Sequence, residues 1–332
     1  MEQPGPAKPP ENPFSGMRIS ENGFLNDVEG RSACIVCGKS RKFFCYHCYI
    51  PVASLKHRLP FVKLPIQIDI IKHKNEIEGK STAIHAAILA PKEVRIYTYP
   101  DIPDYRREEG VVLIFPTPSA VTVASLFSDE PPKVKENYGL PKGHHMGTLL
   151  RCRLNDIIAE SDVGSSGCQQ QLAHRFPVRK AVFIDSTWSQ CRGIYKDSRV
   201  VCLRTVVIQN RISQFWRHQK DSPRWFLATI EAIHQFLIEL HITAYGLDSQ
   251  YEGLNHLGYL NFPQDKVVQF NKTNTEELEP YNGQYDNLLF FFLHMYNLIH
   301  EYYEHHTLRA YRRPLFLEDK YQKQLQQQNT QP

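Results

Sequence analysis

The sequence predicts an α/β domain built around a mostly parallel sheet. Short apolar runs of the kind that form strands alternate along the chain with segments whose apolar residues recur at helical spacing. One run, residues 181–184, is apolar without interruption, as expected of a strand that is buried on both faces. A helix is predicted where large apolar residues follow one another at intervals of four and three, at Phe226, Ile230, Ile233, Leu237 and Leu240.

Length and composition indicate an intracellular, soluble protein with one main domain. The 332 residues are 42% hydrophobic and carry a formal net charge of +4, which permits a nucleic-acid partner without requiring one. The proline-rich start predicts neither a signal peptide nor a transit peptide, and the most apolar segment, 288–299, is interrupted by His294 and Asn297. We therefore expect no membrane partner, and we expect the eight cysteines to be reduced or bound to metal.

Two Cys-x-x-Cys pairs predict a small metal-binding knuckle over residues 31–58, after a flexible arm over residues 1–30. Seven residues separate the pairs, and four thiolates at this spacing suit one structural zinc: Cys34, Cys37, Cys45 and Cys48. A redox role is disfavoured because redox Cys-x-x-Cys motifs usually stand alone at a helix start. Cations beside aromatic residues in this knuckle suit RNA, although a solvated rim over a small core would look the same.

The main domain is expected over residues 59–312 and a polar tail over 313–332. Its first strand is predicted over residues 61–70, where apolar residues alternate strictly, and Pro65 favours an edge position. A polar turn then opens a short helix that Ser81 or Thr82 caps. Lys80 could bind an anion at the start of this helix, though a solvated lysine is the simpler interpretation.

Further strands are predicted at residues 94–99, 111–115, 180–185 and 199–203, and a last long helix at 288–303. Loop-like composition predicts surface insertions at 129–145, 159–175 and 264–284. The sequence has neither G-x-G-x-x-G nor G-x-x-x-x-G-K-[ST], which disfavours a standard dinucleotide fold or a P-loop.

The strand at 180–185 ends at Asp185, and Ser186, Thr187 and Trp188 follow it. Ligands of parallel sheets bind where the carboxyl ends of strands meet the following helices. An acid, a hydroxyl and an indole at that place could act as a base, a hydrogen-bonding group and a stacking face. Alternatively, Asp185 only caps the next helix and Trp188 only packs in the core.

Residues 209–224 mix cations with aromatic side chains more strongly than any other part of the chain. Arg211, Arg217 and Lys220 lie here, with Trp216 among them. Such a mixture is typical of a surface that follows phosphates and stacks on bases, but also of an ordinary solvated loop.

The Asp185-x-Thr187-Trp188 motif resembles the signature of the DTW-domain family. Other positions match that family's pattern in the same order over about residues 31–305. They are the four cysteines, the His73-x-x-Glu76 turn with Lys80-x-Thr82, Phe115-Pro116 after a buried strand, and residues 227–232.

The resemblance implies a fold related to the SPOUT methyltransferases, with a trefoil knot in the C-terminal part of the sheet. It implies a tRNA-uridine aminocarboxypropyltransferase, which moves the 3-amino-3-carboxypropyl group of S-adenosylmethionine to N3 of a D-loop uridine and releases methylthioadenosine. Two alternatives remain: an RNA methyltransferase that uses the same cofactor, and a non-catalytic zinc RNA-binding protein. We further expect a monomer or weak dimer in the nucleus, with a cytoplasmic fraction not excluded.

The resemblance also implies roles for individual residues. Asp185 would take or orient the N3 proton, Thr187 would fix Asp185 or bond the uracil edge, and Trp188 would stack on the extruded base. The residues expected to line the cofactor cleft are Phe115, Pro116, Thr117, Leu203, Arg204, Leu227, Thr229 and Glu231. Contacts with RNA are expected from the knuckle and from Lys80, Arg211, Arg217 and Lys220.

Overall fold

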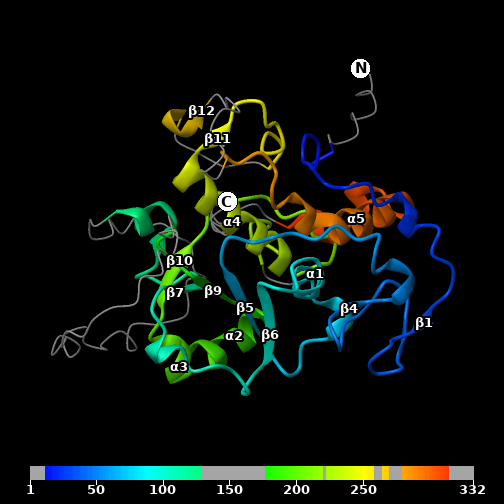
Figure 1. The fold of residues 1–332 in the computed structure, drawn as a ribbon, viewed down its shortest axis with the longest axis horizontal. Helices are drawn as coiled ribbons and strands as arrows, with labels where there is room; N and C mark the ends of the chain where they lie inside the picture. Colours follow the sequence, from blue (N-terminus) through cyan, green and yellow to red (C-terminus); the bar gives the residue numbers. More distant parts are fainter. Residues whose placement is uncertain (1–11, 129–175, 220–221, 258–263, 269–278, 314–332) are drawn as a thin grey trace, which may run out of the picture.

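A six-stranded sheet forms the centre of the computed structural model, which describes residues 12–128, 176–219, 222–257, 264–268 and 279–313 (Figure 1). The strand order is β6-β5-β9-β7-β10-β8, and each pair of neighbours runs parallel. The bounds are β5 Gln67–Lys72, β6 Val94–Thr98, β7 Val111–Ile114, β8 Val121–Thr122, β9 Lys180–Asp185 and β10 Arg204–Val207. The predicted α/β class with a mostly parallel sheet is confirmed.

Strand β9 lies at the point where the direction of the chain across the sheet reverses. From β5 the chain moves outward to β6, crosses to β7 and β8 on the other side, and then inserts β9 between β5 and β7. Its residues Ala181 and Val182 are fully buried, as the apolar run predicts. Because ligands of open parallel sheets bind where the strand order reverses, the carboxyl end of β9 is the natural place for a site.

The two faces of the sheet are covered by two different sets of helices. Helices α1 (Ala83–Leu89), α4 (Thr229–Tyr245) and α5 (Phe290–Tyr302) contribute to the larger core, with Ile70 and Phe183 of the sheet. Helices α2 (Trp188–Tyr195) and α3 (Ser198–Val201) contribute to the smaller core, with Ile71 and Val182. Neighbouring residues of one strand point to opposite faces, so both faces of β5 and β9 are buried.

Two strand predictions are wrong. Strand β5 is internal, between β6 and β9, because Pro65 precedes the strand and its missing amide hydrogen removes no ladder bond. Residues 199–203 do not form a strand: Asp197 accepts a hydrogen bond from the amide of Arg199 at 3.0 Å and opens helix α3 instead. The strand follows one turn later, as β10.

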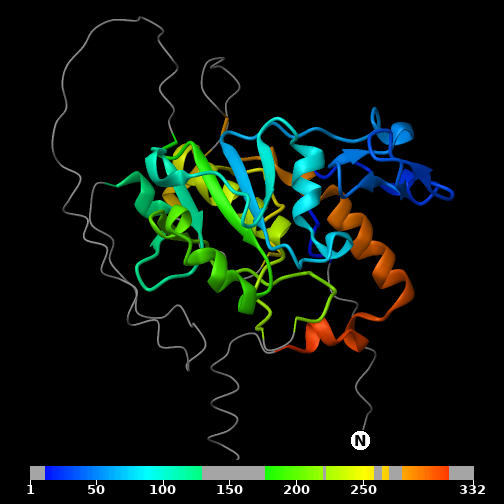
Figure 2. The same ribbon diagram turned by 90° about the horizontal axis from the view of Figure 1, so that it is seen from below.

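Four short strands form the four-cysteine unit, residues 32–51: β1 (Ser32–Ala33), β2 (Ser40–Arg41), β3 (Phe44–Cys45) and β4 (Ile50–Pro51). They make two antiparallel pairs, β1 with β2 and β3 with β4. Figure 2 shows this unit, in blue, beside α1 and α5. Phe44 packs edge-on against Phe291 of α5, with ring centroids 4.9 Å apart, so the unit is fixed to the main domain.

The prediction of a flexible arm is wrong for residues 12–30. Phe14 and Leu25 are buried, because they pack into the larger core. The amide of Arg18 donates to the Asp286 carboxylate at 2.7 Å, and the amide of Ser20 donates to the Asn287 side chain at 2.7 Å. Residues 1–11, both long insertions within 129–175, part of the third insertion, and the tail from 314 lie outside the described residues.

Within the predicted insertion at 264–284, the described residues include β12 (Val267–Val268), which pairs with β11 (Leu247–Asp248). Among the described residues, no helix combines the length and apolar character that crossing a membrane requires. The trefoil knot stays a prediction.

Candidate active site

The carboxylate of Asp185 lies at the carboxyl end of β9 and is only 6% exposed. Its Oδ1 accepts a hydrogen bond from the Thr229 hydroxyl at 2.5 Å, and its Oδ2 accepts one from the Ser81 hydroxyl at 2.6 Å. Thr229 opens α4 and Ser81 precedes α1, and the two helix starts are tied together where the Ile230 amide donates to Thr82 at 3.3 Å. Three elements therefore converge on one carboxylate.

This geometry excludes one part of the alternative interpretation, namely that Asp185 caps the next helix. Thr187, not Asp185, occupies the N-cap position of α2, and the Asp185 carboxylate is bonded to other elements. Thr187 itself is exposed, and the side chain of Trp188 lies outside what the structure describes.

Burial raises the pKa of Asp185 above its ordinary value, against the opposing effects of the two hydroxyl hydrogen bonds and of Lys72. Lys72 is the register partner of Asp185 on β5 and is itself buried, with its ammonium 3.3 Å from Glu78. A carboxylate with a raised pKa is a stronger base than an exposed aspartate, so the site can accept a proton from a weak acid.

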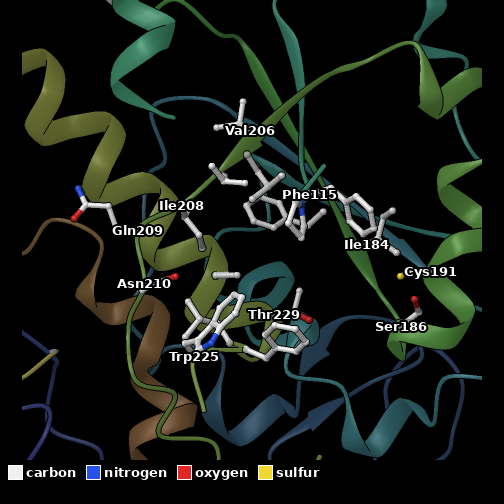
Figure 3. Close-up of a pocket in the computed structure, with 17 residues that line it drawn as sticks. Phe115, Ile184, Ser186, Cys191, Val206, Ile208, Gln209, Asn210, Trp225 and Thr229 are labelled. Carbon is white, nitrogen blue, oxygen red and sulfur yellow. The ribbon is translucent and has the colours of Figure 1, made fainter. Parts of the chain in front are cut away.

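The first cavity, of about 170 Å³, opens beyond the carboxyl ends of β7, β9 and β10 (Figure 3). Aromatic and apolar residues form most of its wall, and Figure 3 shows Phe115 and Trp225 on opposite sides of it. The Phe115 ring is fixed by stacking on Tyr195, with centroids 5.0 Å apart. Thr229, which bonds Asp185, also lines this cavity. Flat aromatic walls with a few polar groups suit a nucleoside.

Half of the expected cofactor residues lie at this cavity, namely Phe115, Pro116, Leu227 and Thr229. The others do not line it. Thr117 is buried, with its hydroxyl 2.6 Å from that of Thr205. Leu203 is buried in the smaller core, and Arg204 begins β10, so both lie at the amino end of that strand.

The residues that follow β10, Ile208, Gln209 and Asn210, line the cavity instead. They were missed because the strand was predicted five residues too early in the chain; placing it at 204–207 would have identified them.

Glu231 bonds two stretches of the chain, at residues 213–214 and at residue 228, and does not line the first cavity. It is fully buried, and its Oε2 accepts hydrogen bonds from the Ala228 amide at 2.9 Å and the Ser213 hydroxyl at 2.7 Å. Its Oε1 accepts one from the Gln214 amide at 2.8 Å. The prediction of a cofactor contact is therefore wrong; Glu231 fastens the start of α4 to the loop before it.

A second cavity, of about 330 Å³, lies between the four-cysteine unit and the main domain. Ser81 lines it, together with Lys80 and Arg217, two of the residues expected to contact RNA. Since Ser81 bonds one oxygen of Asp185 and Thr229 bonds the other, each cavity contributes one hydroxyl to the same carboxylate. Asp185 thus stands between the two cavities.

Arg211 cannot contact RNA in this structure, because its side chain is fully buried. Its Nη1 lies 3.2 Å from Nδ1 of His234, whose Nε2 lies 3.1 Å from the Asp286 carboxylate. The hydroxyls of Tyr251 and Tyr281 also donate to Asp286. Arg211 therefore belongs to a buried polar network with His234 and Asp286. Lys220 lies outside the described residues.

The four thiols of the four-cysteine unit lie close enough to bind one metal ion, with all sulfur atoms within 4.8 Å of one another. Each Cys-x-x-Cys pair is followed by a residue with positive φ, Gly38 at 69° and Tyr49 at 55°. Their amides donate to the carbonyls of Cys34 and Cys45 at 2.8 Å, which folds each pair into a tight turn. Four thiols in this arrangement could hold one metal ion.

Comparison with known proteins gives one family and several relatives. The DTW-domain family model matches residues 42–300. Three relatives are each called tRNA-uridine aminocarboxypropyltransferase 1. The rat protein is 37% identical over 88% of this chain and 85% of its own length, and the human protein 37% identical over 87% and 84%. The Xenopus tropicalis protein is 36% identical over 87% and 85%. No solved structure matches the chain.

Proposed function

Since the chain belongs to the DTW-domain family, we propose that it is a tRNA-uridine aminocarboxypropyltransferase. The reaction would transfer the 3-amino-3-carboxypropyl group of S-adenosylmethionine to N3 of a D-loop uridine. The observation that carries this proposal is the buried carboxylate of Asp185, held by one hydroxyl from each of two cavities. Two ligands of different size and chemistry can meet at such a group.

The aromatic lining of the first cavity supports binding of S-adenosylmethionine there. Phe115 and Trp225 would enclose the adenine, and backbone groups of residues 208–210 would bond it. When bound, the cofactor supplies a sulfonium whose attached carbons are all open to nucleophilic attack. The protein must therefore select the reacting carbon by position. Thr229 stands at the boundary between this cavity and Asp185.

Asp185 would act as the base. In the proposed reaction N3 of the uridine would attack the side-chain carbon next to sulfur, the C–S electron pair would stay on sulfur, and methylthioadenosine would be released. The N3 proton passes to the Asp185 carboxylate. Burial, which raises the pKa of Asp185, makes it a better acceptor for the weakly acidic imide proton.

The four-cysteine unit would bind zinc structurally. All four positions of a tetrahedral site would be filled by thiolates, which leaves none open for a substrate. The ion would fix the unit that forms one wall of the second cavity. A nuclear location stays a prediction.

The by-product tests the proposal against its nearest rival, an RNA methyltransferase. The full chain is incubated with S-adenosylmethionine and unmodified tRNA, and the small molecules are separated by chromatography. Aminocarboxypropyl transfer yields methylthioadenosine, whereas methyl transfer yields S-adenosylhomocysteine. A binding protein without activity would yield neither.

A further inference from the structure

The second cavity contains two buried polar atoms that the protein itself does not satisfy. Nδ1 of His85 and Nη1 of Arg217 have no hydrogen-bond partner among the described residues, and both side chains line this cavity. His85 is only 6% exposed. Leaving such an atom without a partner costs about 1–3 kcal/mol, so the pair indicates a ligand that supplies the missing bonds.

The protonation states of the two groups define what that ligand must offer. Burial, together with the charge of Arg217, lowers the pKa of His85 to about 3, so its ring is neutral and has one donor and one acceptor nitrogen. Arg217 has only donors. The ligand therefore needs at least one carbonyl-like acceptor for Arg217 and a second polar edge for His85.

Several cations line the cavity, namely Arg31, Lys42, Lys80 and Arg217. Arg41 lines it too but is buried and bonded to Cys45 and Tyr46. The acidic group on the wall, Glu78, is already bonded to Lys72 and His47. Phe44 and Trp216 add flat aromatic surface. Cations around an aromatic cavity are typical of a site that binds a base and the phosphates beside it.

Ser81 joins this cavity to the carboxylate. Its hydroxyl donates to Asp185 at 2.6 Å and accepts from the Ala83 amide at 3.2 Å. A hydroxyl oxygen has two acceptor positions, so one remains for an N–H of the ligand.

We propose that the second cavity receives the target uridine after it has swung out of the tRNA, and that Ser81 relays its N3 proton to Asp185. This proposal rests on the function proposed above. As N3 bonds to the transferred carbon and the C–S pair stays on sulfur, the N3 proton moves to Oγ of Ser81. The hydroxyl proton of Ser81 moves to Oδ2 of Asp185. Arg217 donates to a uracil carbonyl, and His85 bonds the second carbonyl edge.

This arrangement selects uracil over cytosine. Cytosine has no proton on N3 for Ser81 to accept, and it offers an amino donor where uracil has a carbonyl acceptor. A site built around a buried donor rejects the base that lacks its acceptor.

The test compares variants of the full chain in steady-state transfer to tRNA, with cofactor affinity measured separately by calorimetry. Arg217→Gln and His85→Phe are expected to raise KM for tRNA about tenfold or more, with the affinity for S-adenosylmethionine unchanged. Arg95→Gln, which removes an exposed arginine on β6, is the matched control and should behave as wild type. Because His85 is buried, thermal melting checks that the His85→Phe variant is folded. If that variant does not fold, Arg217→Gln decides the test, since Arg217 is only half-buried.

Substitutions of Ser81 test the proton relay. Ser81→Ala should lower kcat about 100-fold with KM for tRNA nearly unchanged, and Ser81→Thr should restore most of the rate. If Arg217→Gln and His85→Phe keep the wild-type KM for tRNA, or lose affinity for the cofactor instead, the base does not bind in this cavity. If Ser81→Ala keeps the wild-type kcat, there is no relay. Either result leaves the proposed function standing as long as the wild type makes methylthioadenosine; a wild type that makes none overturns both proposals.

Discussion

The hydroxyl of Thr229 donates a 2.5 Å hydrogen bond to Oδ1 of Asp185 and so joins the first residue of α4 to the last residue of β9. A carboxylate at the end of a strand can rotate about its side-chain bonds. The hydrogen bond from Thr229 to Oδ1 and the one from Ser81 to Oδ2 together fix both oxygens. The orientation of the proposed base is thus set by two helices that are separate in sequence.

Thr229→Val keeps the shape of the side chain and removes the hydroxyl. We expect kcat for aminocarboxypropyl transfer to fall about tenfold, because the carboxylate loses one of its two orienting bonds. Thr229→Ser keeps the hydroxyl and should retain most of the rate. Equal rates for the valine variant and the wild type in steady-state assays would show that this bond does not position Asp185.

Asp185→Asn separates activity from stability. Transfer should become undetectable because an amide cannot accept the N3 proton. The pKa of Asp185 is higher in the folded than in the unfolded protein, where it is near 3.8. The carboxyl group therefore contributes to the free energy of unfolding below pH 3.8, and this contribution is lost as pH rises through the folded-state pKa. At neutral pH the variant should therefore melt at the same or a higher temperature than the wild type.

Melting curves taken at decreasing pH test the expected direction of the difference in melting temperature between Asp185→Asn and the wild type. The advantage of Asp185→Asn should shrink as pH falls toward 3.8. A variant that melts well below the wild type at neutral pH would mean that the ionised carboxylate stabilises the fold.

Ionisation of the buried Glu239 should lower the stability of the protein around neutral pH. Burial raises the pKa of this α4 residue to about 7 from 4.5, against the hydrogen bonds donated by Gln235 and by the Gln209 amide. The contribution of Glu239 to the free energy of unfolding is fully present below pH 4.5 and is lost as pH rises through about 7. Glu239→Gln should therefore gain up to about 3 kcal/mol over the wild type well above pH 7, and little below pH 4.5. Denaturant unfolding across this range measures the difference, and parallel pH profiles for both proteins would contradict the assignment.

Glu231→Ala should destabilise the protein without touching the cofactor. The change leaves the Ala228 amide, the Ser213 hydroxyl and the Gln214 amide without their acceptor, at a cost of about 1–3 kcal/mol for each buried group. Urea unfolding should show this loss, while calorimetry of the folded variant should give wild-type affinity for S-adenosylmethionine. A folded variant of normal stability that fails to bind the cofactor would reinstate Glu231 as a cofactor contact.

Cys45→Ser tests the four-cysteine unit. The variant should lose bound zinc, measured by elemental analysis, and its affinity for tRNA should fall because the unit forms a wall of the second cavity. Cys202→Ser is the control, since this exposed cysteine lies outside the cluster. Equal zinc content in both variants and the wild type would exclude the site.

The parts of the site that lie within one stretch of sequence could be predicted, and the contacts between distant stretches could not. The apolar run before Asp185 identifies β9, and the spacing of the cysteines identifies the four-cysteine cluster, because both patterns are local. The bond from Ser81 to Asp185 depends on how α1 meets the sheet, 104 residues apart in sequence. No local pattern encodes it.

Charged residues gave the clearest failures for the same reason. Arg211 and Arg217 lie in one basic stretch, yet Arg211 is fully buried beside His234, whereas Arg217 lines the second cavity. The partners of Arg211, His234 and beyond it Asp286, lie far along the chain and cannot be inferred from the basic stretch itself. Glu231 was expected at the cofactor through the family resemblance, and the sequence does not show that its carboxylate bonds the backbone amides of Ala228 and Gln214.

Asp185 is proposed to mediate aminocarboxypropyl transfer to a uridine of tRNA. Nucleoside mass spectrometry of unmodified tRNA, treated with S-adenosylmethionine and either the wild type or Asp185→Asn, tests this role. The wild type should produce aminocarboxypropyl-uridine and the variant none. Methylated nucleosides from the wild type, or equal product from both proteins, would contradict it.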